Sequence, residues 1–148
     1  MPLLLALQIF HVLFLLLHDW IPLGGLNDTA AVRAENPGSK LLIATLISTT
    51  PFAIGLYATV DYMRTGHSHW VFTYLWFSYT LLFLGELNAW WIPYFRGTEP
   101  ARIERYRKMF GRTHAFLPER HGIQPNTLHV ILHVVTLTLL IVLAIQTI

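Results

Sequence analysis

Cysteine is absent from the 148 residues of this chain, and charged residues make up only 12% of them. The absence of cysteine excludes disulfides, thiolate metal sites and cysteine nucleophiles. A soluble domain carries about 25% charged residues, so half that share does not cover a water-facing surface. The formal net charge of +2 is too small for a large nucleic-acid-binding surface. These shortages exclude an ordinary soluble enzyme domain and predict no nucleic-acid partner.

Apolar residues are abundant instead: they make up 54% of the chain, and the mean hydropathy is +0.50. They gather in four runs, each with the roughly 20 residues that a helix needs to cross a bilayer. Strands of a membrane barrel would alternate apolar and polar residues, which the run LLIVLAI does not do. The sequence therefore predicts an all-α integral membrane protein, one domain over residues 1–148 that forms an antiparallel bundle of four transmembrane helices. The expected spans are residues 3–23, 41–60, 70–92 and 127–148.

The first apolar run begins near the N-terminus, where a signal peptide would also lie. A signal peptide has a basic n-region and a small-residue cleavage site. Met1-Pro2 carries no basic residue, and no A-x-A pattern follows the run. We therefore expect a retained helix.

Basic residues predict the orientation of the bundle. Nine of the ten Lys and Arg residues lie in two loops, 24–40 and 96–126. Arg64 alone lies in the third loop, which also holds His67 and His69. The positive-inside rule makes the two basic loops cytoplasmic, so both termini should face outward. We expect the bacterial cytoplasmic (inner) membrane.

The longer basic loop contains the pattern of a short amphipathic helix. Thr98-Glu99-Pro100 is a helix-start signal, with a capping hydroxyl and an early proline, and Gly111 is a stop signal. Apolar residues recur between them at helical spacing. We expect an interfacial helix with its apolar side on the membrane. Its basic side chains would face anionic lipid headgroups: Arg102, Arg105 and Lys108.

Ionisable side chains inside the expected spans are the first candidates for function, because a charge in the bilayer is costly. Four of them fall at a similar depth, between roughly 6 and 12 Å from the midplane on the cytoplasmic side, at a rise of ~1.5 Å per residue. They are His18, Glu86, His129 and His133. The isolated polar residues Gln8 and His11 are attributed to hydrogen bonds that join helices.

This layer of histidines and one glutamate predicts binding of a metal ion or of haem. Imidazoles and a carboxylate suit zinc or iron, and His129 and His133 have the i, i+4 spacing of zinc-binding helices. Opposed histidines in a membrane bundle also hold b-type haem, with His18 opposite His129 or His133. The candidate metal ligands are His18, Glu86, His129 and His133, and the candidate cofactor ligands are His18, His129 and His133.

Other functions stay open on the residues alone. Glu86 and His133 are the candidate catalytic pair if the chain is a membrane-embedded enzyme with acid–base chemistry on a lipid-soluble substrate. A Glu–His proton relay would suit a small transporter. The same residues would form a structural ion pair in a non-catalytic accessory subunit, which would pack on a partner membrane subunit or on a second copy of the chain.

Overall fold

The computed structural model describes residues 1–67 and 70–147, in which every regular element is helical. His69 of the third loop and Ile148 of the fourth expected span lie outside the described residues. The long helices are α1 (Pro2–Leu17), α3 (Ser39–Thr65), α4 (Trp70–Glu86) and α7 (Thr127–Thr147). The shorter elements are η1 (Gly24–Leu26), α2 (Thr29–Glu35), η2 (Leu87–Trp91), α5 (Ile92–Arg96) and α6 (Pro100–Phe110).

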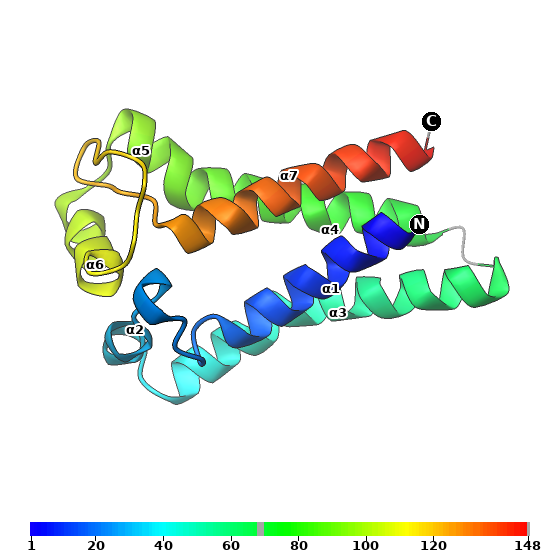
Figure 1. Cartoon of the computed structure of the whole chain (residues 1–148), viewed down its shortest axis with the longest axis horizontal. Helices are drawn as coiled ribbons and strands as arrows, with labels where there is room; N and C mark the ends of the chain where they lie inside the picture. Colours follow the sequence, from blue (N-terminus) through cyan, green and yellow to red (C-terminus); the bar gives the residue numbers. More distant parts are fainter. Residues whose placement is uncertain (68–69, 148) are drawn as a thin grey trace.

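The four long helices lie side by side as a bundle (Figure 1). α1 packs against α3 and α7, and α4 packs against the same two helices, so the four enclose one interior. The elements α2, α5 and α6 gather at one end of the bundle, and both termini lie at the other end. Fully buried apolar side chains fill the interior, among them Leu4, Leu75, Leu139 and Leu143.

Two of these helices, α3 and α7, are long and apolar enough to cross a membrane. α1 has 16 residues and α4 has 17, and both are shorter than the spans expected for them. The all-helical fold class is confirmed within the described residues. On length and composition, membrane crossing is supported for α3 and α7.

The first helix ends at Leu17, so the expected boundary at Leu23 is wrong. Pro22 explains the early end, because a proline lacks the N–H that would bind the carbonyl four residues earlier and its ring clashes there. That carbonyl belongs to His18, and it accepts a hydrogen bond from Asn27 Nδ2 at 2.5 Å instead. The apolar run continues past the helix, but its last residues form turns.

A proline also shapes the end of the third expected span. The chain continues from α4 through η2, a π-helical turn in which the Ile92 N–H binds the Leu87 carbonyl five residues earlier. Pro93 then leaves the Ala89 carbonyl without a helical donor. The Tyr106 hydroxyl of α6 donates to that carbonyl at 2.5 Å. Burial raises the pKa of Tyr106, which keeps this hydroxyl protonated as a donor.

The predicted helix in the long loop is confirmed as α6, with two corrections. Glu99 occupies the cap position, and the Thr98 hydroxyl bonds the Glu99 carboxylate rather than the helix backbone. The apolar side of α6 packs on the protein itself: Met109 is buried with Val32 of α2 and Leu41 of α3. A membrane is therefore not needed to cover this face.

Candidate functional site

Three of the four predicted site residues lie next to one another at the basic-loop end of the bundle. The imidazole of His18, just beyond α1, faces that of His129 on α7 with ring centroids 5.9 Å apart. The rings of His129 and His133 follow at 6.4 Å. Trp90 and Phe110 pack on His129, with ring centroids 4.7 and 5.1 Å from it. The structure thus contains a row of three histidines with aromatic neighbours.

Hydrogen bonds orient two of these imidazoles in the same way. His18 Nδ1 lies 2.8 Å from the Phe14 carbonyl, and His129 Nδ1 lies 2.6 Å from Asn126 Oδ1. Both partners are oxygen acceptors, so each Nδ1 carries a proton and each Nε2 keeps its lone pair in the neutral ring. In His18 the Nε2 atom also lies 3.3 Å from Asp19 Oδ1, and that contact is an ion pair only when the ring is protonated on both nitrogens.

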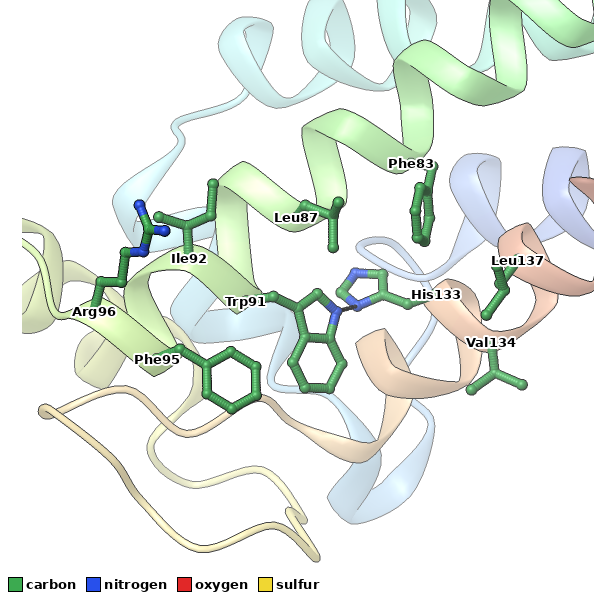
Figure 2. Close-up of a pocket in the computed structure, with 9 residues that line it drawn as sticks. All are labelled: Phe83, Leu87, Trp91, Ile92, Phe95, Arg96, His133, Val134 and Leu137. Carbon is green, nitrogen blue, oxygen red and sulfur yellow. Dashed lines mark hydrogen bonds between the residues drawn. The ribbon is translucent and has the colours of Figure 1, made fainter.

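His133 has the opposite arrangement. The indole Nε1–H of Trp91 donates to His133 Nδ1 at 3.0 Å (Figure 2). The neutral imidazole of His133 must then carry its proton on Nε2. Among residues 1–67 and 70–147, no group of three or more His, Asp or Glu side chains is placed so that it could hold a metal ion.

Glu86, the fourth predicted residue, makes its hydrogen bond with Thr136. The Thr136 hydroxyl lies 2.7 Å from Glu86 Oε1 and 2.9 Å from His11 Nε2. All three side chains are buried, and they come from α4, α7 and α1. A carboxyl, a hydroxyl and an imidazole therefore form one continuous chain across the bundle interior.

The hydrogen-bonding capacity of Glu86, Thr136 and His11 limits how many protons these three side chains hold together. His11 Nδ1 lies 2.9 Å from the Leu7 carbonyl and so carries a proton. The Thr136 hydroxyl has a single proton and three acceptors around it, which are Glu86 Oε1, His11 Nε2 and the Leu132 carbonyl of its own helix at 3.0 Å. It satisfies one of them at a time, so the contacts with Glu86 and His11 both become hydrogen bonds only when at least one further proton lies on Glu86 or on His11 Nε2. This geometry is compatible with a carboxyl and an imidazole that share a proton through a hydroxyl.

Other polar groups line the same interior. Gln8 of α1 donates to the Thr59 hydroxyl of α3 at 3.0 Å. The His11 ring meets the Tyr79 ring edge-on, with centroids 5.2 Å apart. Within the described part of the chain, Glu86 Oε2 and the Tyr79 hydroxyl are buried without a hydrogen-bond partner. Since buried polar atoms normally bond protein or ordered water, both are open to a further partner.

The attribution of Gln8 and His11 to hydrogen bonds that join helices is confirmed, because Gln8 bonds Thr59 of α3 and His11 contacts Thr136 of α7. Sequence reasoning assigned no role to Thr136 and did not connect His11 with Glu86. A usable signal was present, because an imidazole near the midplane of one span and a threonine near the midplane of another have similar depths. Depth alone does not tell which helix faces each of them.

Replacing Thr136 with Val should lower the free energy of unfolding by about 1–3 kcal/mol, because His11 and Glu86 would each lose a buried hydrogen-bond partner. Thr138→Val is the matched control, since Thr138 is only half-buried and its hydroxyl bonds the Val134 carbonyl of its own helix. We expect that control to change stability by less than about 0.5 kcal/mol. Denaturant unfolding in detergent would measure both, and equal losses would contradict a special role for Thr136.

Comparisons of this chain with protein-family models, with curated proteins and with solved structures found no match. The case for a function therefore depends on the contacts, burial and charges described above.

Proposed function

We propose that this chain is a polytopic membrane protein with four spans, and that Glu86, Thr136 and His11 form an acid–base centre inside its bundle. Support for the spans comes from an apolar exterior and a polar interior. Each long helix exposes large apolar side chains, including Leu13, Ile47, Phe77 and Val134, which are 49, 69, 66 and 58% exposed. The polar side chains of Gln8, His11, Thr59 and Thr136 are 0% exposed.

A soluble monomer rarely exposes apolar patches on this scale, whereas lipid solvates them without cost. The short α1 is continued by the turns at residues 18–21, and α4 is continued by η2 and α5 as far as Arg96. These continuations support two further spans beside α3 and α7. The basic loops lie at the end opposite the termini, which favours cytoplasmic loops and external termini.

The orientation can be tested by cysteine labelling, because the chain has no native cysteine. A cysteine that replaces Arg105 should react with an impermeant thiol reagent only after the cells are permeabilised. A cysteine that replaces Arg64, in the last turn of α3, should react in intact cells. The reverse result would overturn the proposed orientation.

The acid–base centre would work by moving two protons in concert. Glu86 gives its carboxyl proton to Thr136 Oγ1, and Thr136 gives its hydroxyl proton to His11 Nε2. A carboxylate and an imidazolium replace a neutral pair, and no heavy atom needs to move. The continuous hydrogen-bond chain is the observation that carries this proposal, since proton transfer requires contact at hydrogen-bond distance.

The buried and unpartnered Glu86 Oε2 is the end of the chain from which a proton can be exchanged with a bound molecule. The continuous contacts and this available oxygen support acid–base chemistry.

This centre predicts that Glu86 and His11 titrate together. Infrared spectroscopy would follow Glu86 through the carboxyl band that Glu86→Gln removes, and NMR would follow His11 through its ring ¹⁵N signals. As the pH varies, both should change with one common midpoint. In the Thr136→Val variant the two midpoints should separate. Unequal midpoints in the unmodified protein would contradict a shared proton.

Metal binding by His18 and His129 is a second candidate function. The observation that favours it is the orientation of both rings, because metal-binding histidines commonly donate their other N–H to a carbonyl or carboxylate oxygen. The close packing of Trp90 and Phe110 on His129 favours a small ion over a haem macrocycle. Two protein ligands would leave the remaining positions of a tetrahedral zinc ion to other donors.

Elemental analysis of the purified protein would test this second candidate. Zinc should be present at about one ion per chain and should fall to background in His18→Gln. His67→Gln is the control, because His67 lies near the other end of the bundle, just after α3. Background zinc in the unmodified protein, after zinc has been supplied and the excess removed, would rule the site out.

A further inference from the structure

A groove of about 490 Å³ runs along the outside of the bundle between α7 and the continuous stretch of α4, η2 and α5 (Figure 2). It is open along one side. Most of its lining is apolar, from Phe83, Leu87, Ile92, Phe95, Val134 and Leu137. The stretch from Phe83 to Arg96 covers about 20 Å at a helical rise of ~1.5 Å per residue. A groove of this shape and lining fits an acyl chain that lies along the protein.

The cationic end of the groove is formed by Arg96, the last residue of α5. Arg96 is exposed and makes no ion pair or side-chain hydrogen bond within residues 1–67 and 70–147. The guanidinium of Arg120 lies over the rings of Tyr94 and Phe95, 5.5 and 6.0 Å from their centroids. Phe95 itself lines the groove, so Arg120 adds positive charge near this end through its contact with that ring.

The acidic residues nearest to these arginines in the sequence have other partners. Glu99 pairs with Arg102 at 3.7 Å, and Glu119 pairs with Arg107 at 3.4 Å. The positive charge at the end of the groove is therefore left for an anionic ligand. A guanidinium binds phosphate strongly, because its planar fork of N–H donors matches two phosphate oxygens.

His133 is the polar side chain that lines the apolar part of the groove beside Trp91. Because its Nδ1 accepts from Trp91, its Nε2–H is a donor for an ester or hydroxyl oxygen of the ligand. His133 also lies three residues before Thr136 on α7, which places the two on neighbouring positions of one helix face. The groove is thus adjacent to the acid–base centre.

We propose that this groove binds one bilayer phospholipid with an anionic headgroup. An acyl chain lies along the apolar lining, and the phosphate lies at the Arg96 guanidinium. The proposal rests on the four-span placement described above, which brings the groove into contact with lipid and its cationic end to the cytoplasmic headgroup layer.

Native mass spectrometry of the delipidated full-length protein tests this binding, with phosphatidylglycerol and phosphatidylcholine as probes. We expect one phosphatidylglycerol to be retained and phosphatidylcholine to be bound more weakly. Arg96→Gln should weaken the binding of phosphatidylglycerol about tenfold or more, because a charge-assisted hydrogen bond is lost. Lys108→Gln is the control, since it removes an equal charge from an exposed part of α6 that is paired with Glu104.

A second variant, Val134→Trp, should fill the apolar part of the groove and weaken the binding of both lipids, while its exposed position leaves the bundle core unchanged.

Equal losses in Arg96→Gln and Lys108→Gln would overturn the proposal in favour of general attraction to anionic surfaces. Competition by inorganic phosphate at the same concentration as lipid would overturn it in favour of a free-phosphate site. If no lipid binds but Glu86 and His11 still titrate together, the groove proposal alone fails. If lipid binds and the two groups titrate separately, the acid–base centre alone fails.

Discussion

The hydroxyl of Thr136 is the point at which three of the four long helices meet through polar contacts. It contacts Glu86 of α4 and His11 of α1, and it lies on α7, the helix that packs against both. The bond from Gln8 to Thr59 adds α3 to the same interior. In a medium of low dielectric constant such bonds are strong, and an unpaired partner is correspondingly costly. Apolar side chains on the outside of the bundle do not fix how the helices face one another. The polar groups inside do so, because they bond one another in one arrangement of the helices.

Composition was sufficient to predict an all-helical chain, and runs of apolar residues were sufficient to locate its long helices. The signals for the short helices were equally local: Asp28 caps α2 by accepting from the Ala31 N–H, and Pro100 begins α6. The depth of each polar residue along its helix could also be estimated. That estimate correctly placed His18, His129 and His133 near one another.

What the sequence could not supply is the direction in which each helix faces. Glu86 was expected at about the depth of the histidines, yet its hydrogen bond is made with Thr136, because the rotation of α4 about its axis depends on how the whole bundle packs. The prolines show the same limit. Pro22 and Pro93 each predict a backbone carbonyl four residues earlier that has no helical donor. Only the tertiary structure shows that Asn27 donates to the first of these carbonyls and Tyr106 to the second.

The π-helical turn at η2 has a consequence for the register between the two ends of the third long segment. A π turn contains one residue more than the corresponding α-helical turn, and each residue of an α-helix rotates the chain by about 100°. Everything after η2 is therefore turned by about that angle relative to an uninterrupted α4. Phe95 and Arg96 of the groove lie after this turn, whereas Phe83 of the same groove and the buried Glu86 lie before it. A single-residue deletion in this turn would leave both halves helical and yet rotate Phe95 and Arg96 away from the part of the groove wall that Phe83 forms.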